Sequence, residues 1–194
     1  MLLSNVDILE MMRCEKIAIS PFDPGLMNPN SYDLKLAEYF VLVQPSEKSL
    51  VEYYGPVHIA TGARVFIPNG GTLLAYTVER VKTAGGIVGR INAKSSTRRK
   101  MISVVTDAGL GDDGYDNHWT LELSGHSYLQ HRRPSFIVGE PICQITFELL
   151  RTPANPAYSG QYNASEMPLG MLPKKDRHLL RPPLPWMVAS LTMW

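Results

Sequence analysis

The segments Ser31-Tyr-Asp-Leu-Lys-Leu36 and Tyr39-Phe-Val-Leu-Val43 carry apolar residues that alternate with polar ones or run together over the length of a strand. Similar runs follow at intervals of about 8–14 residues, separated by Gly, Pro, Asn and Asp. They lie at residues 58–60, 64–67, 72–78, 86–91, 102–106, 119–123, 135–138 and 142–150. This spacing predicts an all-β barrel or sandwich rather than alternating strands and helices.

The chain that precedes these strands predicts one short helix and one loop. Ser4 and Asp7 stand where an N-cap and its acidic partner would begin a helix. Apolar residues then follow in mostly helical spacing, which predicts a helix over residues 5–14. Residues 20–30 hold prolines and a glycine, which interrupt the regular backbone hydrogen bonding of a strand, so we expect a loop there.

The strand pattern lapses after about Arg151, and the rest of the chain is rich in proline. A segment of this kind is expected to pack on something else rather than to fold independently. The sequence therefore predicts a β domain over residues 1–151, including the N-terminal helix, and a proline-rich C-terminal arm or tail over residues 152–194.

Composition and charge narrow the classes of function. The formal net charge of +1 argues against a general nucleic-acid binder, although basic residues gather at 90–100 and 174–181 and leave room for a small anion. No basic leader followed by an apolar run begins the chain, and no stretch is long and apolar enough to predict a membrane span. Cys14 and Cys143 lie far apart, which indicates a reducing, cytoplasmic location.

The run Lys94-Ser-Ser-Thr-Arg-Arg99 combines hydroxyl, ammonium and guanidinium groups. With the amides of a turn, such groups can hold a polyphosphate, because hydrogen bonds to charged phosphate oxygens are strong. Taken alone, the run fits a solvated surface turn somewhat better, because basic and serine-rich runs are common.

Glu122 is the sharpest single candidate. Strand alternation in Trp119-Thr-Leu-Glu-Leu123 places Thr120 and Glu122 on one face and the apolar residues on the other. If the polar face lines a pocket, burial would raise the pKa of the Glu122 carboxyl and suit it to proton transfer. An exposed strand carboxylate explains the pattern equally well.

The turn Gly109-Leu-Gly-Asp-Asp-Gly-Tyr115 offers a third piece of a site. Asp112 could accept a hydrogen bond from a sugar hydroxyl while Tyr115 packs on the sugar, but a hairpin turn alone would favour the same composition. The five histidines never stand in a His-x-Glu motif with Pro-Cys-x-x-Cys, so we expect no zinc-activated water and no metal site. A P-loop is absent from the sequence.

Taken together, these residues resemble the dCTP deaminase branch of the dUTPase-like superfamily. The resemblance rests on Asn30-Ser-Tyr-Asp-Leu-Lys-Leu36, on Lys94-Ser-Ser-x-x-Arg99, and on Glu122 within Thr-Leu-Glu-Leu. It covers roughly residues 1–165, and the joint spacing of the motifs is more specific than any one of them.

The resemblance implies a distorted jelly-roll β-barrel that assembles as a homotrimer with active sites between subunits. It also implies zinc-free hydrolysis of dCTP to dUTP and ammonia, with Mg²⁺ carried by the triphosphate. In that family dTTP acts as a feedback inhibitor. The implied partners are therefore nucleotides and further copies of the chain, with no nucleic acid and no membrane.

The resemblance also implies roles for individual residues. Glu122 would take a proton from water and pass it to cytosine N3 and then to the leaving amine, while Ser95 and the Ala108 carbonyl position that water. Arg99 would hold the site together and contact phosphate. The remaining implied nucleotide contacts are Lys94 and Ser96 on phosphate, Asp112 on the 3′-hydroxyl, Tyr115 near the sugar, Thr120 on the base edge through its backbone, with Leu121 beside it, and Tyr158, Gln161, Tyr162 and Ser165 in the closing arm.

Four positions depart from the family pattern. Arg98 and Met101 replace an alanine and a glycine, and Gln161 and Ser165 replace a lysine and a glutamine. The motifs therefore leave three alternatives beside a dCTP deaminase. These are a bifunctional deaminase and dUTPase that yields dUMP and pyrophosphate, a dUTPase alone, and a nucleotide-binding regulatory protein without activity.

Overall fold

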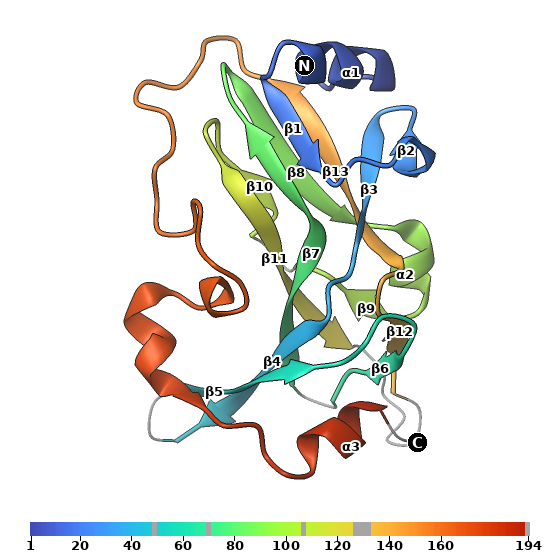
Figure 1. The fold of residues 1–194 in the computed structure, drawn as a ribbon, viewed down its shortest axis with the longest axis vertical. Coiled ribbons are helices and arrows are strands. Elements are labelled where there is room, and N and C mark those ends of the chain that lie inside the picture. The colour runs from blue at the N-terminus through green and yellow to red at the C-terminus, as the bar shows by residue number, and fades with distance from the viewer. Residues whose placement is uncertain (48–49, 69–70, 106–107, 126–132, 193–194) are drawn as a thin grey trace.

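Strands form most of the regular secondary structure in the computed structural model, which describes residues 1–47, 50–68, 71–105, 108–125 and 133–192 (Figure 1). The larger sheet has seven strands in the order β14-β5-β4-β7-β11-β9, with β1 beside β7. These strands are β1 (Ile17–Ser20), β4 (Tyr39–Ser46), β5 (Leu50–His58), β7 (Thr72–Thr83), β9 (Ile102–Ser103), β11 (Asp116–Gly125) and β14 (Leu180–Arg181).

A second sheet of five strands has the order β10-β8-β13-β3-β2, and a two-stranded ribbon joins β12 to β6. These strands are β2 (Met27–Asn28), β3 (Ser31–Lys35), β6 (Arg64–Phe66), β8 (Ile87–Ala93), β10 (Leu110–Gly111), β12 (Ser135–Ile137) and β13 (Pro141–Leu149). The two large sheets meet at an isolated bridge between Leu36 and Thr77. Strand pairing among the described residues does not continue into a closed barrel, so the fold is jelly-roll-like, and the mainly β prediction is confirmed.

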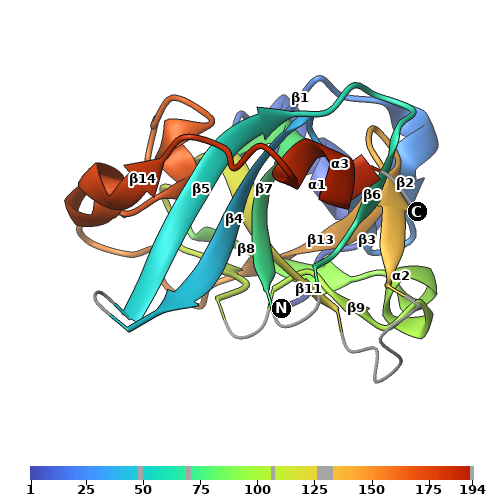
Figure 2. The same ribbon diagram turned by 90° about the horizontal axis from the view of Figure 1, so that it is seen from below.

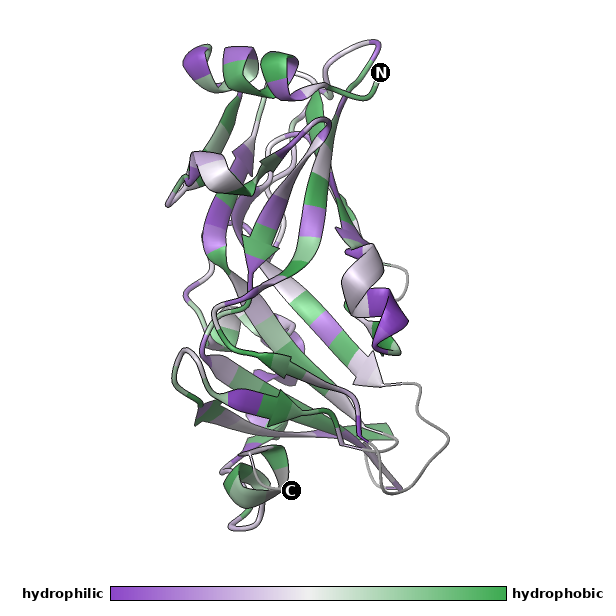
Figure 3. Ribbon diagram, turned by 90° about the vertical axis from the view of Figure 1, so that its right-hand side faces the viewer, coloured by the Kyte–Doolittle hydropathy of each residue, from purple (hydrophilic) through white to green (hydrophobic). Residues whose placement is uncertain are grey.

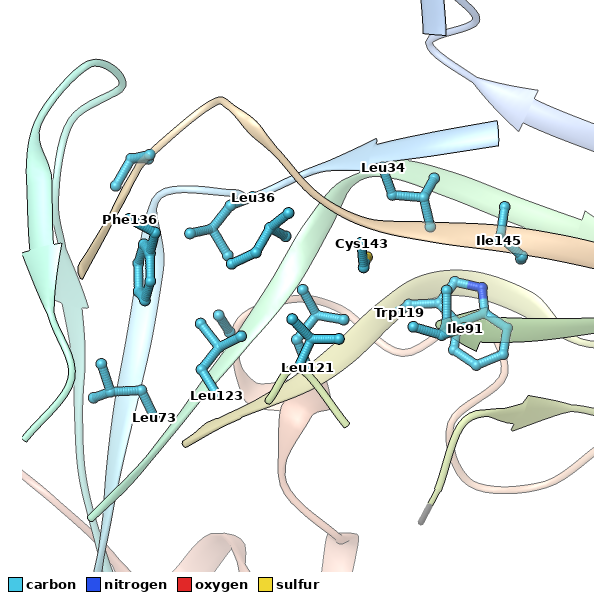
Figure 4. Close-up of a cluster of buried hydrophobic side chains, with 14 of the residues drawn as sticks. Leu34, Leu36, Leu73, Ile91, Trp119, Leu121, Leu123, Phe136, Cys143 and Ile145 are labelled. Atoms are coloured by element: carbon cyan, nitrogen blue, oxygen red, sulfur yellow. The ribbon is translucent and has the colours of Figure 1, made fainter. Parts of the chain in front are cut away.

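The core lies between the two large sheets, where alternate side chains of each strand meet (Figure 4). Trp119, Leu121 and Leu123 of β11 are buried there, beside Cys143 and Ile145 of β13. The stripes of hydropathy along the strands in Figure 3 show the same alternation. Thr120 and Glu122 therefore face away from this core, as strand alternation predicts.

The N-terminal helix α1 (Asn5–Arg13) agrees with the predicted helix over residues 5–14. Its capping box is complete, because the Ser4 backbone N–H donates to Asp7 Oδ2 at 2.8 Å and the Asp7 N–H donates to Ser4 Oγ at 3.3 Å. Of the described residues, none forms a helix of the length and apolar character that a bilayer crossing requires.

The structure corrects two predictions about strands and loops. Residues predicted as loop hold the end of β1, a 3₁₀ helix (Pro24–Leu26) and β2. The strand predicted at residues 58–60 lies earlier, in β5. Gly55 and Pro56 fall where the pairing of β4 and β5 shifts register, between Phe40 and Leu42. This bulge accommodates a proline inside a strand, and that proline hid the strand from the sequence pattern.

The C-terminal tail packs on the β domain, as the sequence predicts. It contains two 3₁₀ helices (Leu169–Met171 and Lys174–Leu179), then β14, then α3 (Met187–Thr192). Met171 and Leu172 are buried against the outer face of the larger sheet, and β14 pairs in parallel with β5 (Figure 2). Met187 of α3 is fully buried in the main core.

We expect Met187→Ala to lower the free energy of unfolding by about 2–5 kcal/mol, because it removes a fully buried side chain and leaves a cavity. Val188→Ala is the matched control on the same helix, since Val188 is 49% exposed. Urea unfolding of both variants tests the expectation. Equal stability of the two would contradict the docking of α3 in the core.

Glu79 of β7 is a fully buried carboxyl that no sequence motif points to. Its Oε2 accepts a hydrogen bond from the Lys35 backbone N–H at 2.8 Å, and its Oε1 lies 3.7 Å from Lys35 Nζ. Burial raises the pKa of Glu79, and the contacts with Lys35 offset only part of that effect.

Glu79→Gln should therefore stabilise the fold more at high pH than at low pH. The wild-type carboxyl contributes most below its unfolded pKa, about 4.3, and that contribution is lost as pH rises through the raised pKa of the folded state. Unfolding free energies of both proteins between pH 4 and 8 measure the difference, with Glu10→Gln on the exposed side of α1 as control. A difference that stays flat or falls with rising pH would refute this account of Glu79.

Candidate active site

A cavity of about 560 Å³ opens on the outer face of the larger sheet. That volume lies within the range of small-molecule sites. The cavity is bounded by β11, by the turn before it, by β4, β5 and β7, and by the arm and tail. The predicted site residues that line it are Ala108, Asp112, Tyr115, Thr120, Glu122, Tyr158 and Tyr162.

Glu122 reaches this cavity because of its register in β11. It stands opposite Leu74 of β7, and its backbone N–H donates to the Val104 carbonyl at 2.8 Å. Leu74 packs with Met171 of the tail and Tyr53, so the carboxylate sits beside an apolar wall. Tyr162 is close enough that the charge of Glu122 adds to burial, the main cause, in raising the pKa of Tyr162. A half-buried carboxylate in such a place can exchange protons with a bound ligand.

The acidic turn places Asp112 and Tyr115 on the same cavity. The Tyr115 hydroxyl donates to the His118 carbonyl at 2.8 Å, and its ring lies 4.9 Å from that of Trp119. Burial raises the pKa of Tyr115 strongly, so this phenol stays neutral. A Cβ on Gly111 would come within 2.6 Å of the Trp119 ring, so this position needs glycine.

Some of the predicted residues of the arm line the cavity and others do not. Tyr158 and Tyr162 line it, whereas the Gln161 side chain accepts from the Lys174 N–H at 3.2 Å and Ser165 Oγ donates to the Gln161 carbonyl at 2.7 Å. Ser165 lies on a neighbouring cavity instead. The Leu121 side chain is fully buried in the core, so only its backbone can face a ligand.

The basic run predicted as a turn is a short helix, α2 (Ser95–Arg99), and among the described residues none from 94 to 99 lines the cavity. Lys94 makes an ion pair with the Asp33 carboxylate, which already satisfies part of its charge. Ser95, Ser96 and Arg99 are exposed. Within one chain, therefore, two of the three predicted pieces converge, and the basic run stands apart from them.

Met101 follows α2 with a φ of 63°, in the left-handed region that favours glycine. This conformation gives a physical reason for the glycine that the resembled family has here, and it makes methionine a locally strained replacement. Arg98 is exposed on the same helix.

Sequence reasoning missed Asn117, Asn163 and the apolar wall made by the tail. Asn117 lines the cavity and donates to the Tyr162 carbonyl at 2.6 Å. An asparagine in a strand carries no signal of such a contact in sequence alone. In the part of the chain that the structure describes, no group of three or more His, Cys, Asp or Glu side chains is placed to hold a metal.

Comparisons with known proteins agree with one another. A family model described as dCTP deaminase-like matches residues 2–150. The chain is 31% identical over 172 residues to the "dCTP deaminase, dUMP-forming" of Tropheryma whipplei (strain Twist), covering 85% of this chain and 86% of that protein. It is 32% identical over 172 residues to the dCTP deaminase of Natronomonas pharaonis, covering 83% and 87%.

Among solved structures, the 2′-deoxycytidine 5′-triphosphate deaminase of Agrobacterium tumefaciens is similar, with a TM-score of 0.58 and 21% identity. The match covers 76% of this chain and 48% of that one, so this chain spans about half the length of that protein. This likeness shows a shared fold.

Proposed function

The chain belongs to the dCTP deaminase-like family and is an enzyme of that kind, and from this premise we propose that it hydrolyses dCTP to dUTP and ammonia without zinc. The observation that carries the proposal is the meeting of Glu122, Asp112 and Tyr115 on one cavity. An enzyme that hydrolyses a nucleotide base needs a group for proton transfer, a hydrogen-bond acceptor for the sugar and an aromatic ring beside the sugar. Glu122, Asp112 and Tyr115 would supply these in that order.

In the proposed reaction, a water oxygen attacks C4 of cytosine while Glu122 takes the proton of that water. Glu122 passes this proton to N3 and then carries the remaining proton from the new C4 hydroxyl to the amine. The C4=O bond forms as the C4–N4 bond breaks, and ammonia leaves. Ala108 lines the same cavity as Glu122, so its carbonyl would be near enough to hold the attacking water. Asp112 would accept a hydrogen bond from the 3′-hydroxyl, and the half-buried Tyr115 would pack near the sugar.

The triphosphate would be held by residues of α2 from a neighbouring subunit. Arg99, Ser95 and Ser96 are exposed and lie off the cavity of their own chain, as expected if the sites form between subunits of a homotrimer. Mg²⁺ would arrive bound to the triphosphate as part of the substrate, and arm residues would close on it.

A second candidate is a bifunctional enzyme that yields dUMP and pyrophosphate. It is favoured by the names of several relatives, among them the "dCTP deaminase, dUMP-forming" of Dictyoglomus thermophilum, which is 32% identical over 168 residues. Asp112 in its Gly-Leu-x-Asp turn is the residue that would activate a water on phosphate in that case.

The pure protein incubated with dCTP and Mg²⁺ tests both candidates. Separation of the nucleotides should show dUTP and ammonia in equal amounts if deamination is the only reaction. Accumulation of dUMP and pyrophosphate would favour the bifunctional enzyme. Unchanged dCTP, despite measurable binding, would contradict both candidates and favour a regulatory protein.

A further inference from the structure

Asn163 joins the arm to the acidic turn through every part of its amide. Its Oδ1 accepts from the Asp116 backbone N–H at 2.8 Å. Its Nδ2 donates to the Gly114 carbonyl at 2.9 Å and to the Tyr158 carbonyl at 3.1 Å. One side chain thus binds the turn at Gly114, the start of β11 at Asp116 and the arm at Tyr158, and both of its amide N–H groups are used.

Further hydrogen bonds reinforce the same joint. Asn117, which is 3% exposed, donates to the Tyr162 carbonyl at 2.6 Å. The Tyr158 N–H donates to the Asp113 carbonyl at 2.8 Å, and the Ala164 N–H donates to the Asp116 carbonyl at 3.0 Å. The arm is therefore docked at one end on the turn and at the other on the start of β11 in its own chain.

Gly114 permits the close approach of the two segments. Its φ is +101°, and a Cβ there would stand 2.9 Å from both the N and the O of Tyr158. The backbone of the arm rests directly on this glycine, so a side chain would push the two segments apart.

The joint connects two walls of the candidate cavity. The turn supplies Asp112 and Tyr115, and the arm supplies Tyr158 and Tyr162. The Asn163 side chain bonds both segments but is not among the groups that line the cavity. Its bonds hold the two lining segments together, which is how supporting residues preorganise a site.

We propose that Asn163, assisted by Asn117, is a positioning residue that holds the arm and the acidic turn as one preorganised wall of the nucleotide site. The proposal rests on the proposed function. Asn163 acts through Tyr158 and Tyr162 rather than on the nucleotide. Loss of its amide should free the arm, so that the free energy of nucleotide binding includes the entropic cost of ordering the arm. Proton transfer at Glu122 should be unaffected once the nucleotide is bound.

The test is Asn163→Ala, with Ser159→Ala as the matched control at an exposed position of the same arm. We expect KM for dCTP to rise about tenfold, as the loss of more than one hydrogen bond implies, and kcat to stay within about threefold. Amide hydrogen exchange over residues 158–164 should quicken in Asn163→Ala while the core strands keep wild-type protection. The control should match wild type in each measurement.

A double-mutant cycle with Tyr158→Ala separates positioning from general destabilisation. If Asn163 acts through the arm, its substitution should raise KM much less when Tyr158 is already removed. Equal effects of Asn163→Ala in both backgrounds would overturn the proposal, as would a fall in kcat at unchanged KM.

Failure of the proposed function would look different. If wild type leaves dCTP unchanged, the exchange measurement alone decides about the joint, since it needs no turnover. Faster exchange of the arm in Asn163→Ala would then support the joint, and unchanged exchange would overturn it.

Discussion

Glu122→Gln is expected to lower kcat for dCTP deamination by about 10²–10⁴-fold and to leave the affinity for dCTP nearly unchanged. Glutamine has almost the shape of glutamate but cannot accept the proton of the attacking water. Glu122 faces a cavity rather than the core, so the substitution leaves core packing untouched. Both the water attack and the departure of ammonia would lose their proton carrier.

The measurement is single-turnover deamination of dCTP together with calorimetric binding of the same nucleotide. Glu140→Gln removes an exposed carboxylate elsewhere on the surface and should keep wild-type rates. Near-normal turnover by Glu122→Gln would remove this residue from the mechanism. A large loss of affinity would instead make it a binding residue.

The position of Glu122 could be predicted because strand alternation depends only on local geometry. Once Trp119 and Leu121 are assigned to the core, alternation places the Glu122 side chain on the opposite face of the strand. What alternation cannot supply is the opposite wall of the cavity. That wall comes from Met171 and its neighbours in the tail, where prolines remove any period that a pattern could follow.

The basic run shows a second limit of sequence reasoning. Residues 94–99 and Glu122 are near in sequence, and their spacing matches one family, yet the fold carries α2 away from the cavity of its own chain. Spacing along a chain reports which family the motifs resemble, whereas convergence in space depends on how strands pair and on which copies meet. The role of Asn163 could not be predicted from the sequence for a related reason. Its three hydrogen-bond partners are backbone groups, which carry no sequence signature.

If the sites form between subunits, two inactive variants should restore activity when they share a trimer. Glu122→Gln and Arg99→Ala should each be nearly inactive alone. In mixed trimers, some sites take an intact Glu122 from one chain and an intact Arg99 from its neighbour. Every mixed trimer holds one such site among its three interfaces, so mixed trimers freed of homotrimers should recover about a third of wild-type activity.

The two variants, Glu122→Gln and Arg99→Ala, are expressed together with different affinity tags. Purification through both tags isolates the mixed trimers, which are then assayed with dCTP. The matched control pairs Glu122→Gln with Asp112→Ala, because Glu122 and Asp112 line one cavity of the same chain. No chain in that mixture carries both groups, so its activity should stay at the level of the separate variants. Recovery only in the pair with Arg99 would fix the site between subunits and assign the phosphate contact to α2 of the neighbour. Equal failure of both pairs, in trimers shown to be mixed by their tags, would contradict a site shared between subunits.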